Sequence, residues 1–276
     1  MAHGNQGNQG NQGQGNQGNQ GNKKVPVLAL IGDRVHNADY IHTHLNRLFA
    51  EMNLGFHYTI AYEEFQNKKA ILDRLANYKV FLGFRDGTNY PGGYVGPDAW
   101  PYTTSMMAPQ APLVNKPWVT DAFGQAVKEW VAGGGGLFAA HNNCHVALYS
   151  KDYREVAGGM YDGHPPMRPW KVLVKREQAQ HPIMRGVTDY IVTDEQHFTL
   201  YDGDPKYILM EGENIDGIPY VTDTGRRLAR STQAWAFPYG RGRVVHNSVG
   251  HNLDALWKPQ TLTFWSNAIR WLLREI

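Results

Sequence analysis

The stretch GGGGLFAAHNNCHVAL, Gly133 to Leu148, decides the fold. Its apolar residues LFAA are typical of a buried parallel strand, and the glycines before them end a helix. In a nucleophile elbow, the reactive side chain stands directly after such a strand, on a strained turn. Here His141 holds that position, and the single cysteine, Cys144, comes three residues later without a flanking glycine. The pattern favours histidine chemistry at the turn and a packed thiol at Cys144.

Outward from this stretch, apolar segments of strand length alternate with amphipathic helical segments in the first half of the chain. The predicted strands are Val25–Ile31, Phe56–Ala61, Val80–Phe84 and Leu137–Ala140, and the predicted helices are Tyr40–Met52, Lys68–Asn77 and Thr120–Ala132. This order predicts an α/β fold, with helices on both faces of a mostly parallel central sheet, hence a three-layer sandwich.

The second half of the chain is richer in strand patterns. Its predicted strands are Trp170–Val174, Tyr207–Glu211, Ala234–Phe237 and Arg243–Ser248, and its last helix is Pro259–Leu273. The segment Gly240–Arg241–Gly242 is interpreted as a hairpin turn, since no helix follows it to form a phosphate loop. Because no boundary interrupts the pattern, residues 24–276 are predicted to form one domain.

Two segments have no apolar periodicity. Residues 1–23 are a low-complexity tail of GNQ repeats, predicted to be a disordered linker or a tether. Self-association through this tail leaves a homo-oligomer open as an alternative. Residues 85–117 are rich in Gly, Pro and Tyr and are predicted to form a long insertion or lid.

Charge and composition exclude several classes of protein. The formal net charge is +2, so no strong field indicates a nucleic-acid partner or an acidic membrane surface. One cysteine excludes an intramolecular disulfide, and no apolar run reaches the length of a membrane span. No signal-peptide pattern is present, which favours a cytoplasmic location.

Histidines recur in the segments that follow the predicted strands. In open α/β sheets, ligands bind beyond the carboxyl ends of the strands, so we expect several of these histidines to share one pocket. The polar segments are 33–36, 85–86, 141–145, 194–197 and 250–252. Imidazoles with a carboxylate either bind a divalent metal or act directly as general acid and base. The four-residue spacing of His141 and His145 is compatible with joint metal ligation, and equally with two hydrogen-bonded histidines that shape the pocket.

Five segments in order resemble the ThuA-like, or trehalose-utilisation, family. They are GGGGLFAAH with its preceding helix, GGMYDGHPP (158–166), HPIMRGV (181–187), TDEQHFTLY (193–201) and YGRGRVVHNSVGHN (239–252) with the final helix. The resemblance covers about residues 25–276. It implies a flavodoxin-like, class I glutamine amidotransferase-like fold in which the Cys-His-Glu triad is generally missing. It also implies a role in carbohydrate use, particularly of keto-sugars derived from disaccharides.

The resemblance implies a pocket built around His141, Glu195 and His251. These are the expected catalytic groups or the ligands of a divalent metal such as zinc. The residues expected to bind substrate are Arg34, His36, His145, His164, His197 and Asn252. By contrast, His181 is expected to cap a turn beside Pro182.

Three functions remain open at this point. The first is a protein that binds or acts on a small-molecule carbohydrate, as a hydrolase or lyase of a keto-sugar. The second is a non-catalytic scaffold or self-assembling protein that uses the GNQ tail. The third is glutamine amidotransfer through Cys144.

Overall fold

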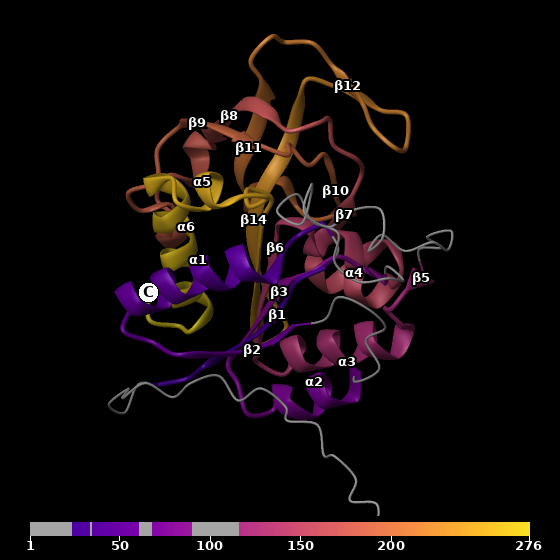
Figure 1. Ribbon diagram of the computed structural model, residues 1–276, viewed down its shortest axis with the longest axis vertical. Helices are drawn as coiled ribbons and strands as arrows, with labels where there is room; N and C mark the ends of the chain where they lie inside the picture. The colour runs from indigo at the N-terminus through magenta and orange to yellow at the C-terminus, as the bar shows by residue number, and fades with distance from the viewer. Residues whose placement is uncertain (1–23, 34, 61–67, 90–115) are drawn as a thin grey trace, which may run out of the picture.

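The computed structural model describes residues 24–33, 35–60, 68–89 and 116–276. Within these residues, nine strands form one sheet in the order β2-β1-β3-β6-β15-β14-β11-β8-β9 (Figure 1). Their bounds are β1 (Val27–Ile31), β2 (Phe56–Ile60), β3 (Val80–Phe84), β6 (Gly136–Ala140), β8 (Arg168–Val174), β9 (Tyr190–Asp194), β11 (Ile208–Asn214), β14 (Arg230–Tyr239) and β15 (Gly242–Asn247). The chain therefore has a mixed α/β fold with a large central sheet.

The sheet has two halves of different character. Strands β2, β1, β3, β6 and β15 pair in parallel, whereas β15, β14, β11, β8 and β9 pair antiparallel. The sequence-based prediction of a mostly parallel sheet therefore holds for the first half only, and the turn between β14 and β15 is too short for a parallel crossover. This turn at Gly240–Arg241 joins β14 to β15 as a hairpin, as predicted.

Helices cover both faces of the parallel half. They are α1 (Ala38–Glu51), α2 (Lys68–Leu75), α3 (Asp121–Ala132), α4 (Lys151–Ala157), α5 (Leu253–Leu256) and α6 (Pro259–Leu272). Figure 1 shows α1, α5 and α6 on one side of the sheet and α2, α3 and α4 on the other. Alternate residues of the fully buried strand β1 serve the two sides, since Val27 and Ile31 join the core beside α1 and α6 while Leu28 and Leu30 join the core beside α3.

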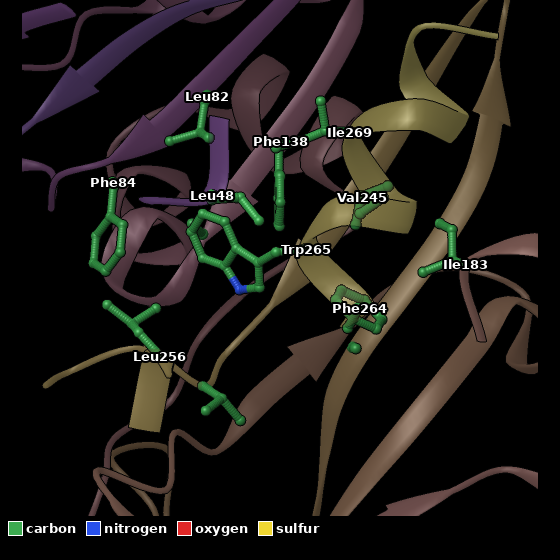
Figure 2. Packing of buried hydrophobic residues seen from close by; sticks show 14 of the residues in the cluster. Leu48, Leu82, Phe84, Phe138, Ile183, Val245, Leu256, Phe264, Trp265 and Ile269 are labelled. Atoms are coloured by element: carbon green, nitrogen blue, oxygen red, sulfur yellow. The ribbon is translucent and has the colours of Figure 1, made fainter. Parts of the chain in front are cut away.

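Trp265 of α6 centres the larger core. Its ring lies 4.6 Å from that of Phe138 in β6 and 5.9 Å from that of Phe84 in β3, and Leu48 of α1 lies next to it in Figure 2. Complete burial of one such side chain contributes roughly 1.5–3 kcal/mol. The C-terminal helix thereby fixes the strands whose ends carry the candidate site.

Short elements escaped the sequence-based prediction. They are α4, α5, β9 and the small antiparallel pairs β4 (Thr88–Asn89) with β5 (Lys116–Pro117), β7 (Gly159–Tyr161) with β10 (Thr199–Tyr201), and β12 (Tyr220–Val221) with β13 (Arg227–Leu228). Two to seven residues are too few to establish a periodicity. The GNQ tail and most of the predicted insertion, residues 90–115, lie outside the described residues.

The described residues also settle the place of His181 and the lengths of the helices. His181 caps a short 3-10 helix as predicted, with its Nδ1 3.2 Å from the backbone nitrogen of Ile183. No helix there is both long and apolar enough to cross a membrane.

Candidate functional site

His141 stands at a strained turn directly after β6. Its φ of 44° lies in the left-handed region that a residue other than glycine rarely adopts, and a 3-10 helix begins there. Gly250 permits the neighbouring loop to pass close by, because a Cβ atom at that position would lie only 3.0 Å from the Cβ of His141. The prediction that His141 occupies the elbow position is confirmed.

A hydrogen bond fixes the tautomer of His141. Its Nδ1 lies 2.5 Å from the carbonyl oxygen of Ser248, which only accepts, so Nδ1 carries the hydrogen. In the neutral ring, Nε2 then offers a bare lone pair. This atom is buried and has no hydrogen-bond partner within the described part of the chain.

His36, which follows β1, is held in the same way by Asp33. Its Nδ1 lies 2.8 and 3.0 Å from the two carboxylate oxygens, and its Nε2 is likewise buried without a partner among the described residues. The backbone nitrogen of Asp86 and the side chain of Asn142 also donate to Asp33. Burial lowers the pKa of His36 and outweighs the attraction of Asp33, so the ring is neutral.

Glu195, one residue beyond β9, is the centre of the cluster. Its Oε2 lies 3.0 Å from Nδ1 of His251, 3.5 Å from Nε2 of His197, and 3.7 Å from Nε2 of both His141 and His164. Burial alone would raise the pKa of Glu195, but the surrounding histidines lower it, so the carboxylate is ionised.

Asp194 ties the loop of His251 to β9. Its carboxylate accepts from the backbone nitrogen of Gly250 at 2.7 Å and from that of His251 at 3.0 Å. The carboxyl end of parallel strand β15 is thus fastened beside the end of an antiparallel strand. This contact brings Glu195 to the histidines of the parallel half.

The nitrogens and the carboxylate form two adjoining groups. In each group, every residue offers one ligand atom, and these atoms all lie within 4.8 Å of one another. The first group is His36, His141, Glu195 and His251, and the second is His164, Glu195 and His197. Glu195 belongs to both groups, whereas His145, which the spacing allowed as a partner of His141, belongs to neither.

The surroundings of these groups are rich in negative charge. Asp33, Asp86 and Asp194 are buried near Glu195, and the buried cation beside them is Arg85, whose Nη1 lies 3.9 Å from Asp86. Each of these carboxylates has partners among the described residues, with His36 bonded to Asp33 and backbone nitrogens bonded to Asp194. Burial raises the pKa of Asp194, and, against the effect of burial, Glu195 and Asp194 raise the pKa of His251.

A cavity of about 290 Å³ opens beside the cluster. The residues that line it are Val35, His36, Asp86, Asn142, His145, Tyr161, His164, Glu195 and His197. Four of the six predicted substrate-binding residues therefore reach it. The volume is at the lower limit of ligand pockets, near 300 Å³, and suits a small ligand.

The other two predicted substrate-binding residues are Arg34 and Asn252. Arg34 lies outside the described residues. Asn252 has a structural role, because its side-chain oxygen caps α5 by accepting from Ala255 at 2.9 Å and its amide donates to the carbonyl of Thr193 at 3.2 Å.

Cys144 is a packed thiol. Its side chain is buried and donates to the carbonyl oxygen of His141 at 3.3 Å, and burial raises its pKa to about 12. A nucleophilic cysteine needs an accessible thiolate, so this environment speaks against amidotransfer through Cys144.

Sequence reasoning missed Asp33 and Asp194 as site residues. Both are fully buried carboxylates that position a histidine loop. A signal was available, since each acidic residue stands at or just beyond the end of an apolar strand, where a carboxylate needs a partner.

Comparison with known proteins places this fold. The profile of the ThuA family, described as trehalose utilisation, matches residues 105–272. Similar solved structures are ThuA-like proteins from Parabacteroides merdae (TM-score 0.61, 13% identity, 90% of each chain) and Bacteroides uniformis (TM-score 0.60, 15% identity, 94% of this chain and 95% of that one). A cytoplasmic protein from Salmonella typhimurium is also similar, with TM-score 0.52, 12% identity, and coverage of 89% of this chain and 99% of its own. At these identities the likeness shows the fold alone. No curated protein sequence matches the chain.

Proposed function

Because the chain belongs to the ThuA, or trehalose-utilisation, family, we propose that it acts on a sugar or keto-sugar in the histidine-lined cavity. A divalent cation held by His36, His141, Glu195 and His251 is part of this proposal. The reaction class that suits the site is hydrolysis or elimination beside a sugar carbonyl.

One observation carries the proposal. Nε2 of His141, without a hydrogen when the ring is neutral, faces the ionised carboxylate of Glu195 at 3.7 Å. Without a cation, attraction between these two atoms requires a proton on the ring, and a bound cation takes the place of that proton. His36, whose Nε2 is buried without a partner among the described residues, belongs to the same group.

The donor set fits zinc. Imidazole nitrogens with one carboxylate, four ligands in all, are typical of this ion. The hydrogen bonds from His36 to Asp33 and from His141 to a backbone carbonyl are of the kind that orient metal-binding imidazoles. When bound, such a cation polarises a carbonyl oxygen or activates a water molecule.

The cavity residues supply the remaining interactions. A volume near 290 Å³ suits one sugar ring, and Asp86, Asn142 and Tyr161 present polar groups for its hydroxyls. His145 also lines the cavity and takes part in neither ligand group. Burial lowers the pKa of His145 to about 4, so its ring is neutral at pH 7 and suits a hydrogen bond to a sugar hydroxyl better than proton abstraction.

The test combines metal analysis with sugar binding. Purified protein is stripped with a chelator, reloaded with zinc and titrated calorimetrically with glucose, a keto-derivative of glucose, and trehalose. We expect at least one tightly bound cation per chain, and binding of the single-ring keto-sugar by the loaded protein only.

Variants locate the site within this experiment. His141→Ala is expected to lower cation affinity by at least about 100-fold, because a direct ligand is lost. The control is His57→Ala, which removes an exposed histidine of β2. Stripped protein that binds sugar as well as loaded protein would contradict the proposal.

A further inference from the structure

A second group of nitrogens faces Glu195 from the side of the cavity. His164 follows β7 and His197 lies between β9 and β10, and their Nε2 atoms are 3.7 and 3.5 Å from Oε2 of Glu195. The four-ligand group already contains three histidines and this carboxylate. His164 and His197 are therefore not needed for the first cation.

From this geometry we propose a second divalent cation, held by His164, His197 and Glu195, with the Glu195 carboxylate bridging the two ions. The inference rests on the proposed function, because it adds a neighbour to the first cation. It also defines the ligand more closely, as a sugar that presents two adjacent oxygens to two ions.

The tautomer of His164 supports this site. Its Nδ1 lies 2.8 Å from the carbonyl oxygen of Pro165 and so carries the hydrogen. In the neutral ring, the bare Nε2 then faces the carboxylate of Glu195, as at His141. His197 is buried, and its Nδ1 has no partner among the described residues. Its other ring nitrogen, Nε2, is the one that faces Glu195.

The spacing of the rings suits a pair of ions. His141 and His197 belong to different groups, yet their rings are stacked, with centroids 4.2 Å apart and planes 23° from parallel. Their Nε2 atoms lie 3.7 and 3.5 Å from the same carboxylate oxygen of Glu195. Ions in two-metal sites stand about 3.5–4 Å apart, and neighbouring nitrogens around one shared carboxylate are the arrangement that such a pair needs.

Both groups reach the cavity. His36 of the first group and His164 and His197 of the second line it, together with the shared Glu195. A ligand in the cavity therefore faces both ions. A carbonyl and a neighbouring hydroxyl of one sugar ring present oxygens at the short spacing that two bridged ions require, and oxygen donors are ligands that such cations accept.

The experiment counts ions. Stripped protein is loaded with Mn²⁺, passed through a desalting column, and analysed by mass spectrometry for metal and by electron paramagnetic resonance for coupling between ions. We expect two equivalents per chain with a coupled signal in the wild type, and one equivalent with the signal of an isolated ion in His164→Ala and in His197→Ala.

The outcomes separate this inference from the proposed function. One equivalent in the wild type, or two in His164→Ala, overturns the second site and leaves the first cation in place. No tight equivalent in the wild type overturns both. The exposed-histidine variant His57→Ala should keep two equivalents, and unfolding curves of the stripped variants show whether each is folded.

Discussion

The two halves of the sheet contribute to the site in different ways. In the parallel half, His36, His141 and His251 stand at or within five residues of the ends of β1, β6 and β15, at the carboxyl edge where parallel strands meet. On the antiparallel side, Glu195 and His197 come from one loop after β9, and His164 comes from a small separate pair of strands. The parallel half therefore supplies ligands by a general rule of topology, whereas the antiparallel side supplies them through particular loop contacts.

The two halves of the sheet therefore have different roles in the site. The parallel half holds two of its three histidines by a hydrogen bond from Nδ1, from His36 to Asp33 and from His141 to Ser248. The antiparallel side brings the carboxylate and the cavity-lining histidines. Variants in each half should accordingly affect different ions.

Glu195→Gln tests the point where the two halves meet, and we expect the largest effect there. Loss of the charge should weaken both cations by at least about 100-fold in a chelator competition. The stripped variant should be at least as stable as stripped wild type, because the amide of Gln donates to a bare histidine nitrogen. A stripped variant that is less stable by more than about 1 kcal/mol would oppose this account, and the exposed Glu129→Gln is the control.

Asp162→Asn tests the antiparallel side alone. The buried carboxylate of Asp162 accepts from Arg226 and from the backbone and hydroxyl of Thr224, each at 2.9 Å, and holds the loop of His164. We expect a loss of about 3 kcal/mol in unfolding free energy, and a weaker second cation with the first unchanged.

The matched control for that variant is Asp202→Asn. Asp202 forms a two-point ion pair with Arg154 at 2.6 and 2.7 Å, but both side chains are exposed, so its loss should cost less than about 1 kcal/mol. Equal losses of unfolding free energy in the two variants would show that the buried ion pair of Asp162 contributes no more to stability than the exposed pair of Asp202.

Mild acid tests the core beneath the parallel half. Burial lowers the pKa of His44 in α1 and of His246 in β15 to about 3, against about 6.5 in the unfolded chain. Below pH 6.5 the unfolded state binds more protons, so stability is lost as the pH falls from 6.5 towards 3. At pH 5 the expected loss is about 2 kcal/mol per histidine. Urea unfolding at pH 7.5 and pH 5 should show a smaller loss in His44→Leu than in wild type, and an identical loss would contradict the prediction.

Asp33→Asn tests the parallel half at the site itself. An amide still approaches His36 but no longer raises the basicity of its ring, so the first cation should weaken about tenfold while the second is unchanged. Chelator competition measures both ions, with the exposed Asp39→Asn as the control. A change confined to the second ion would reverse the assignment of the groups.

Cys144→Ser should have the smallest effect. A serine hydroxyl can donate to the carbonyl of His141 in place of the thiol, so stability should change by less than about 1 kcal/mol, with cation and sugar binding retained. Loss of an activity in this variant, with folding intact, would restore the amidotransfer hypothesis.

Much of the parallel half could be predicted from the chain. Apolar runs such as Val80–Phe84 match the structure because strands buried on both faces leave a continuous apolar signature. The elbow position of His141 followed from its place after β6. Apart from the hairpin of β14 and β15, the antiparallel pairing could not be predicted, because short alternating segments carry no record of their partners.

The sequence by itself determined which residues follow the buried strands, and so which histidines reach the carboxyl edge of the sheet. It also determined that the chain belongs to a carbohydrate-associated family, through its ordered motifs. Only the tertiary structure decided which nitrogen of each histidine is free, because that depends on acceptors such as the carbonyl of Ser248, 107 residues away from His141. It likewise decided that Glu195 faces two groups of histidines, since that arrangement depends on contacts between loops distant in sequence and leaves no pattern in the chain.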